Sequence, residues 1–259
     1  MTNRISRIFG KFAGFAFPKF IQTIINKVYV RIFDIDLEEF GRIEDYKTLN
    51  ALFTRSLKKP RIFDENPSVM IAPTDSLITE LGKVEDNKAL QIKGMEYHVN
   101  ELLGESVGEG YEFVNFYLSP RDYHRYHAPC DMEVLEVRYF GGELLPVNLP
   151  SLKKNKDLFV RNERVVLVAR DKNNEKFFFV AVGALNVGKM SLNFEPRVQT
   201  NARANQKTRF SYEKPIIIKK GEEMGMFEMG STAVIFGKHL TTSLQINQKV
   251  RFGDSIGTF

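Results

Sequence analysis

The sequence predicts an α+β fold in which a mainly antiparallel β catalytic core follows an N-terminal amphipathic helical part. The first sixty residues place apolar side chains at helical spacing, whereas from about residue 68 short apolar runs alternate with turn residues. These runs follow one another too closely for the crossover helices that a parallel sheet requires. We therefore expect a helical part over residues 1–60 and a β-rich domain over residues 61–259.

Two helical patterns lie on either side of Pro18, because proline cannot continue a helix. Residues 1–33 hold six basic side chains and no acidic one. Beside this basic face runs an apolar stripe: Ile5, Ile8, Phe9 and Phe12, then Phe20, Ile21, Ile24, Ile25, Val28 and Ile32. Such helices suit a membrane interface, although the stripe could equally pack on the protein's own core. A third, short helical pattern covers residues 49–57 and ends before Pro60.

The rest of the chain contains several candidate strands. Residues 164–170 and 176–182 flank a polar tip at 171–175, which predicts a β-hairpin. Further candidates cover residues 113–118, 132–140, 215–218 and 232–236. These segments are expected to pair as the antiparallel core.

Charge and composition restrict the setting of the protein. The net charge of +5 is modest, but the concentration of basic residues at the N-terminus would draw this end to nucleic acid or to an anionic lipid surface, and the apolar stripe favours lipid. The longest uncharged run, residues 177–188, is too short to span a bilayer, which takes about 20 residues. Lys11 and Lys19 interrupt any signal-peptide layout, and the single Cys130 allows no intrachain disulfide, so we expect a cytoplasmic setting.

Two of the four histidines, His124 and His127, lie in one segment rich in Arg, Asp and Tyr, residues 119–130. Histidine is the side chain best suited to move protons near neutral pH, so this segment is a candidate site. The spacing of His124, His127 and Cys130 also allows a zinc interpretation, but no fourth ligand or paired cysteine motif accompanies it. Purely structural histidines are a third interpretation.

A second candidate site is the Gly230-Ser231-Thr232 tripeptide, which directly precedes a predicted strand. Glycine adds no side-chain obstruction, so the Gly230 carbonyl could be presented to an attacking oxygen. On spacing alone the tripeptide is also ordinary turn chemistry.

Taken together, several segments resemble the phosphatidylserine decarboxylase family in order and spacing. The resemblance covers nearly the whole chain and rests on residues 117–127, 157–164, 182–188, 220–225 and 230–232. It implies that the chain is a proenzyme that cuts itself between Gly230 and Ser231, and that Ser231 becomes a covalent pyruvoyl cofactor and the Schiff-base position. Met229 stands where the family has Leu, an apolar exchange that is usually tolerated.

The resemblance also assigns roles to individual side chains. His127 corresponds to the base of self-cleavage and Asp75 to its orienting carboxylate, so that Ser231, His127 and Asp75 would act as a unit. Ser76 stands where the family usually has Gly, which makes the local turn around Asp75 a departure. His124 corresponds to the histidine of proton transfer in decarboxylation. Arg121 or Arg125 could meet the lipid phosphate or serve in structural ion pairs.

The implied reaction converts phosphatidylserine to phosphatidylethanolamine and carbon dioxide. The implied setting is a peripheral protein on the cytoplasmic face of the cell membrane, a homodimer whose protomers are each cut into residues 1–230 and 231–259. Three rival interpretations remain: a serine hydrolase using Ser231, His127 and Asp75, a noncatalytic membrane-binding β-domain, and a pyruvoyl enzyme for a soluble amino acid. The hydrolase interpretation lacks the Gly-x-Ser-x-Gly elbow of the commonest hydrolase fold.

Overall fold

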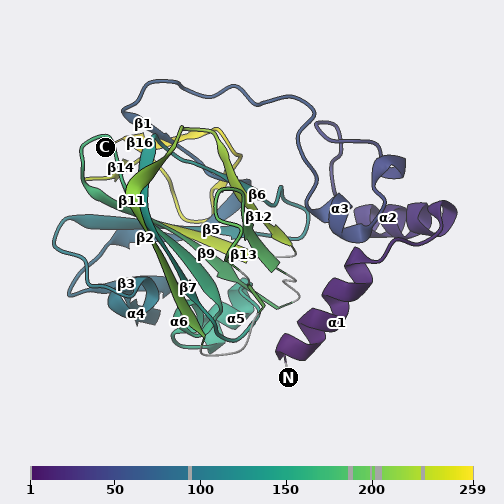
Figure 1. Ribbon diagram of the computed structural model, residues 1–259, viewed down its shortest axis with the longest axis horizontal. Coiled ribbons are helices and arrows are strands. Elements are labelled where there is room, and N and C mark those ends of the chain that lie inside the picture. Colours follow the sequence, from purple (N-terminus) through teal and green to yellow (C-terminus); the bar gives the residue numbers. More distant parts are fainter. Residues whose placement is uncertain are drawn as a thin grey trace.

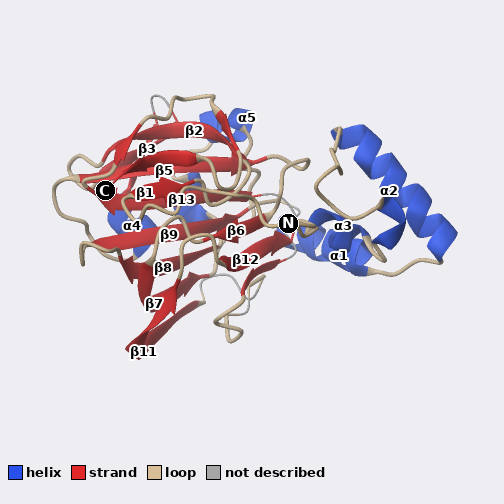
Figure 2. Ribbon diagram, turned by 90° about the horizontal axis from the view of Figure 1, so that it is seen from above, coloured by secondary structure: helices blue, strands red, loops and turns tan. Residues whose placement is uncertain are grey.

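The computed structural model describes residues 2–92, 95–185, 189–198, 200–201, 206–228 and 231–258. Three helices come first in the chain and gather at one end of a β-rich body (Figures 1 and 2). They are α1 (Thr2–Gly14), α2 (Lys19–Phe33) and α3 (Leu49–Phe53), with a 3-10 turn at Ile43–Asp45 before α3. The two longer helices flank Pro18 as the sequence predicted. No helix in the described part combines the length and apolar character needed to cross a bilayer.

The β-rich body is built around an eight-stranded antiparallel sheet in the order β11-β7-β8-β9-β13-β5-β2-β15. Its strands are β2 (Ser76–Lys83), β5 (Tyr111–Leu118), β7 (Met132–Phe140), β8 (Arg164–Arg170), β9 (Lys176–Gly183), β11 (Lys207–Ile218), β13 (Ser231–Lys238) and β15 (Lys249–Val250). The predicted hairpin is β8 and β9, and the predicted antiparallel α+β class is confirmed.

Smaller sheets complete this body (Figure 2). One joins β10 (Lys189–Leu192), β12 (Glu223–Glu228) and β6 (Arg125–His127), and another joins β1 (Val69–Ile71), β16 (Ser255–Thr258) and β14 (Thr241–Thr242). A two-stranded ribbon pairs β3 (Lys88–Ile92) with β4 (Met95–His98). Three short helices lie between strands: α4 (Val99–Leu103), α5 (Leu149–Lys154) and α6 (Leu158–Arg161).

One apolar core fills the β-rich body. The fully buried rings of Phe177, Phe178 and Phe179 show that β9 is covered on both faces, which explains its continuous apolar run. Tyr126 of β6 packs on Phe179, with ring centroids 5.3 Å apart, so the β6 sheet closes over one face of the large sheet. This packing fixes the position of the histidine segment relative to β13.

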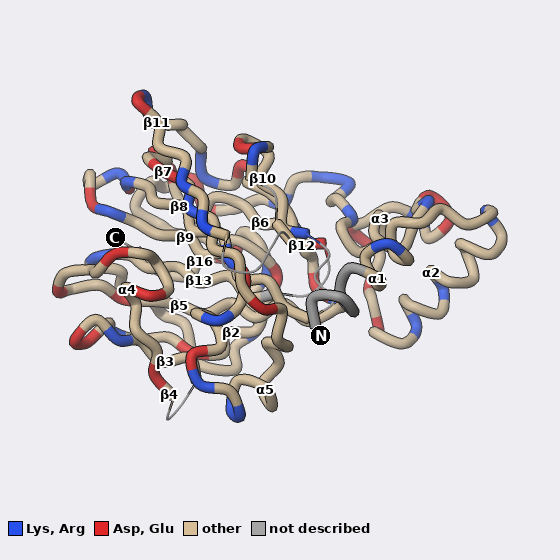
Figure 3. The backbone as a smooth tube through the Cα atoms, turned by 60° about the horizontal axis from the view of Figure 1, so that its bottom comes forward, with Lys and Arg blue, Asp and Glu red and all other residues tan. Residues whose placement is uncertain are grey.

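Helix α2 buries two polar side chains and exposes four apolar ones. Its polar Gln22 and Asn26 are buried, and the Asn26 amide donates to the carbonyls of Ile43 and Tyr46. The apolar side chains at a spacing of four residues point outward: Phe20, Ile24, Val28 and Ile32, each more than half exposed. The stripe predicted for α2 is thus divided: Ile25 packs on the buried cluster of Ala13, Leu49 and Leu52, whereas these four side chains do not. Lys and Arg occur along the helix and acidic residues do not (Figure 3).

Candidate active site

The backbone of Ser231 begins β13 in the middle of the large sheet. It pairs with Leu118 at the end of β5 on one side and with Gly183 at the end of β9 on the other. Met229 and Gly230, the residues before the expected cut, lie outside the described residues, and so does the side chain of Ser231.

A tight turn carries the chain from Leu118, the partner of Ser231, to His124. The Asp122 carboxylate accepts hydrogen bonds from the Ser119 amide and hydroxyl at 2.6 and 2.7 Å, which closes this turn. From the other direction, the Phe227 amide near the end of β12 donates to the His124 carbonyl at 2.9 Å. His124 is thus linked to both sides of the expected cut: by the turn to Leu118, the partner of Ser231, and by a hydrogen bond to Phe227 of β12.

The imidazole of His124 is fully buried, and only one of its nitrogens has a hydrogen-bond partner in the described part of the chain. Its Nδ1 lies 2.8 Å from the carbonyl oxygen of Asp122. Because a carbonyl only accepts, Nδ1 must carry the hydrogen and Nε2 must present its lone pair. Among the described residues Nε2 has no hydrogen-bond partner. Burial lowers the pKa of His124 to about 3, helped by the positive charge of Arg55, so the imidazole is neutral near pH 7.

The imidazole of His127 has both nitrogens occupied. Its Nδ1 lies 2.9 Å from the Gly221 carbonyl and its Nε2 lies 3.0 Å from the Tyr123 hydroxyl, which must therefore donate to it. The ring stacks on Phe252 at a centroid distance of 3.7 Å. Burial lowers the pKa of His127 to about 4. In the β6–β12 ladder His127 pairs with Glu223, at the opposite end of β12 from residue 229.

Asp75 makes its hydrogen bonds to groups other than His127. Its carboxylate accepts from the Arg61 guanidinium and from the Phe252 amide, at 2.7 Å for the latter. Arg61 also binds Glu39, so Asp75 belongs to a charged cluster. The structure brings Asp75 and His127 to the same residue, Phe252, without a hydrogen bond between them.

The two arginines of the motif have different surroundings. Arg125 forms a two-pronged ion pair with Glu223 at 2.8 and 3.0 Å and donates to the Thr54 carbonyl, which identifies it as a structural ion-pair partner. Arg121 is 41% exposed on its side chain and lies 3.7 Å from the exposed Asp34, so it is the more accessible of the two. Cys130 is buried, which raises the pKa of its thiol and keeps it protonated. Among the described residues no three potential ligands gather as a metal site.

Two cavities meet at the histidine segment. A polar cavity of about 660 Å³ is lined by charged side chains that include Arg55, Arg61, Asp75, Arg121 and Asp122. An apolar groove of about 540 Å³ runs between the helices and reaches Phe53, Pro120 and Leu185. Because Phe53 and Pro120 line the groove while Arg55 and Arg121 line the polar cavity, an amphiphilic molecule would meet both environments here.

Comparison with known proteins decides the family. The sequence model described as phosphatidylserine decarboxylase matches residues 49–258. A Helicobacter pylori protein named phosphatidylserine decarboxylase proenzyme is 57% identical, over 100% of this chain and 98% of its own length. The chain belongs to the phosphatidylserine decarboxylase family.

Proteins of the same name from other bacteria match this chain at lower identity. The Campylobacter jejuni protein is 46% identical over 97% of each chain, and the Anaeromyxobacter protein is 34% identical over 98% of this chain and 94% of its own. The family resemblance read from the sequence is thereby confirmed.

Sequence reasoning missed the side chains that hold the two histidines. Tyr123 lies inside the recognised phosphatidylserine decarboxylase segment, but only the fold shows that its hydroxyl takes the free nitrogen of His127. Phe53 and Arg55 lie some seventy residues earlier in the chain, where the apolar spacing of the helical pattern indicates a buried face for Phe53 but gives no sign that Arg55 is buried. The available signal in the sequence was Arg55 itself, an arginine directly after a run of apolar residues at helical spacing.

Proposed function

We propose that this chain decarboxylates phosphatidylserine to phosphatidylethanolamine and carbon dioxide after cutting its own backbone between Gly230 and Ser231. The observation that carries the proposal is the position of Ser231, at the start of β13, where the flanking segments lead to a histidine nitrogen that no described residue binds. Membership of the family supports it. The products of the cut would be residues 1–230 and 231–259, with Ser231 converted to a pyruvoyl group.

The surroundings of residue 231 fit that group. Gly183 across the ladder adds no side chain, and the buried Nε2 of His124 has no partner among the described residues. The pyruvoyl group supplies an electron sink, which an amino acid needs if it is to lose carbon dioxide. A neutral imidazole can accept at Nε2 a proton that the substrate ammonium gives up and deliver it to the α-carbon in place of the lost carbon dioxide, and we assign this role to His124.

Self-cleavage needs a base that takes the proton of the Ser231 hydroxyl. By family resemblance we assign this role to His127, whose ring is held by the Gly221 carbonyl and stacks on Phe252, the residue whose amide binds Asp75. Because Nε2 of His127 accepts from Tyr123, it must either give up that hydrogen bond or pass the proton through the Tyr123 hydroxyl. His124 is the competing candidate, since its Nε2 needs no such exchange.

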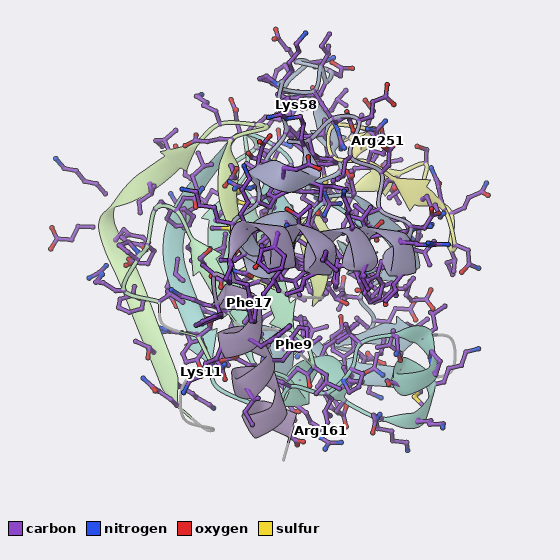
Figure 4. The ribbon with its side chains drawn as sticks, turned by 90° about the vertical axis from the view of Figure 1, so that its right-hand side faces the viewer. Phe9, Lys11, Phe17, Lys58, Arg161 and Arg251 are labelled. Atoms are coloured by element: carbon purple, nitrogen blue, oxygen red, sulfur yellow. The ribbon has the colours of Figure 1, made fainter. Side chains whose placement is uncertain are left out.

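The helical end supports a lipid substrate over free serine. The outward apolar ridge of α2 is continuous with the groove that ends at Phe53, and an acyl chain in this groove would reach the ring beside His124. In the view onto the helices, Phe9 and Phe17 lie between Lys58 and Arg251 on one side and Arg161 on the other (Figure 4). An apolar surface flanked by basic side chains is suited to binding an anionic bilayer.

We accordingly propose a peripheral protein on the cytoplasmic face of the cell membrane. A homodimer follows from the family resemblance, and sedimentation of the purified protein in detergent tests it.

Carbon dioxide release tests the activity. Wild type should release it from phosphatidylserine in mixed micelles but not from free serine, whereas Ser231→Ala should release none. Ser191→Ala is the matched control, because the Ser191 hydroxyl has no hydrogen-bond partner among the described residues. Ester hydrolysis by an uncut chain would support a serine hydrolase instead, and vesicle binding without carbon dioxide release would support a noncatalytic domain.

A further inference from the structure

Three consecutive residues at the end of α3 hold the histidine segment. The Phe53 ring lies against His124, with ring centroids 3.8 Å apart. The Thr54 carbonyl accepts from Nε of Arg125 at 3.0 Å. Nη2 of Arg55 donates to the carbonyls of Arg121 and Asp122 at 2.6 and 3.1 Å. Helix α3 lies between α2 and the β6–β12 region (Figure 1), so this contact joins the helical end to the β-rich body.

The carbonyl of Asp122 is shared between Arg55 and His124. It accepts from Nη2 of Arg55 and from Nδ1 of His124, at 3.1 and 2.8 Å. The position of this one oxygen therefore fixes both the tautomer and the orientation of the imidazole. Without Arg55, the turn would lose the donor that holds two successive carbonyls, at Arg121 and Asp122.

Arg55 is an unusual residue to find at this place. It is only 2% exposed, it forms no ion pair within the described residues, and its Nε and Nη1 have no hydrogen-bond partner there. Its guanidinium lies over the Phe40 ring, 4.5 Å from the centroid. Burying a cation without a partner anion lowers the stability of the fold. The presence of Arg55 beside His124 therefore points to a functional role. Its charge opposes protonation of the imidazole, whereas the nearby Arg125 is neutralised by Glu223.

We propose that Arg55 is a positioning residue for His124, holding the Asp122 carbonyl so that the imidazole stays neutral with Nε2 free for the reaction. Phe53 supplies the surface on which the ring rests. The inference rests on the role of His124 in the proposed function. It makes the end of α3 part of the structure that positions His124.

The ring tautomer of His124 tests the inference without reference to activity. We would record nitrogen-15 spectra of the imidazoles in the uncut Ser231→Ala chain, where only four histidines occur and His124→Asn assigns the signal. The background protein should show a neutral His124 protonated on Nδ1 alone. Arg55→Met should give a mixture of tautomers, because the Asp122 carbonyl is no longer held.

Arg164→Met is the matched control. Arg164 is also buried, donates to the carbonyls of Leu102, Val160, Asn162 and Glu101, and lies over a phenylalanine ring. Its loss should leave the His124 tautomer unchanged. An unaltered His124 signal in Arg55→Met would overturn the inference, even if decarboxylation were already demonstrated.

Kinetics of the cleaved enzyme give the second measurement. Arg55→Met should lower kcat by about 10- to 100-fold with little change in KM, because Arg55 acts through His124 rather than on the substrate. Arg55→Lys keeps the charge and can still donate to a carbonyl, so it should recover part of the loss. If Arg55→Met does not fold, Arg55→Lys and Phe53→Leu decide the question by the tautomer spectrum. A change confined to KM would contradict the inference, and no activity in wild type would refute the proposed function while leaving the spectral result intact.

Discussion

His124 and His127 are three residues apart, yet their ring nitrogens differ in what they can do. Both carry hydrogen on Nδ1 because each faces a carbonyl, of Asp122 and of Gly221. Only His124 has a free Nε2 in the described part of the structure, since Tyr123 occupies that of His127. We therefore predict that single substitutions separate decarboxylation from self-cleavage.

His124→Ala should still be processed at least in part but should lose decarboxylation, by about 100- to 10,000-fold as is usual when an acid–base group is removed. Intact mass reports processing, and carbon dioxide release reports turnover. An uncut His124→Ala chain would transfer the self-cleavage base to His124.

His127→Ala should remain a single uncut chain because the predicted base is absent. Circular dichroism must show the wild-type fold, since loss of the ring also removes its stacking on Phe252. Tyr123→Phe, which removes the competing hydroxyl and keeps the ring, is the informative comparison. Normal cutting in His127→Ala would disprove this assignment.

The sequence identified the segments of the site but not its contacts. The Asp75 carboxylate binds Arg61 and the Phe252 amide, partners that lie 14 and 177 residues away in the chain. Such choices depend on which loops the fold brings together, and pattern and spacing carry no information about them. The burial of Arg55 could not be predicted for the same reason, because tertiary packing decides whether an arginine is buried.

At the scale of elements, α2 makes the clearest prediction. Ile24→Asp combined with Ile32→Asp should weaken binding to anionic vesicles, since two charges would enter the apolar ridge. Ile217→Asp with Ile246→Asp makes the same chemical change at two exposed isoleucines outside the helices. In vesicle co-sedimentation, the α2 double variant should bind more weakly than the double variant outside the helices. Equal binding by both would show that α2 does not contact the membrane.

Other elements show where sequence patterns succeed and fail. The strand predicted at residues 132–140 is β7 with the same bounds, because turn residues mark both of its ends. The third helical pattern was expected to reach residue 57, but α3 ends at Phe53. The chain leaves the helix there so that Arg55 can reach the Arg121 and Asp122 carbonyls. Strand β12 was missed because its glycine and glutamate residues hide the alternation.

For the whole molecule, the buried histidines make stability depend on pH. The pKa of His127 is about 4 in the fold and near 6.5 when unfolded, so the unfolded chain takes up a proton first as the pH falls. Its contribution, on the order of 3 kcal/mol, is present above pH 6.5 and is lost as the pH falls toward 4. The lowered pKa of His124 likewise makes the fold less stable as the pH falls.

Urea unfolding of the uncut Ser231→Ala chain between pH 7 and pH 4 measures this dependence. His127→Gln should flatten the fall in unfolding free energy, whereas His98→Gln, at an exposed histidine, should not. Equal slopes in the two variants would show that His127 is not protected from protonation in the fold.

The backbone cut would leave the molecule in one piece. Strand β13 pairs with β5 over eight residues and with β9 over six, so residues 231–259 stay built into the sheet. Under native conditions the two chains should migrate together and separate only on denaturation.

The most direct test is the intact mass of purified, active protein under denaturing conditions. Two chains should appear, residues 1–230 and residues 231–259, the shorter one resistant to N-terminal sequencing because it begins with a ketone. A single chain with full activity and an unmodified serine at position 231 would contradict the account.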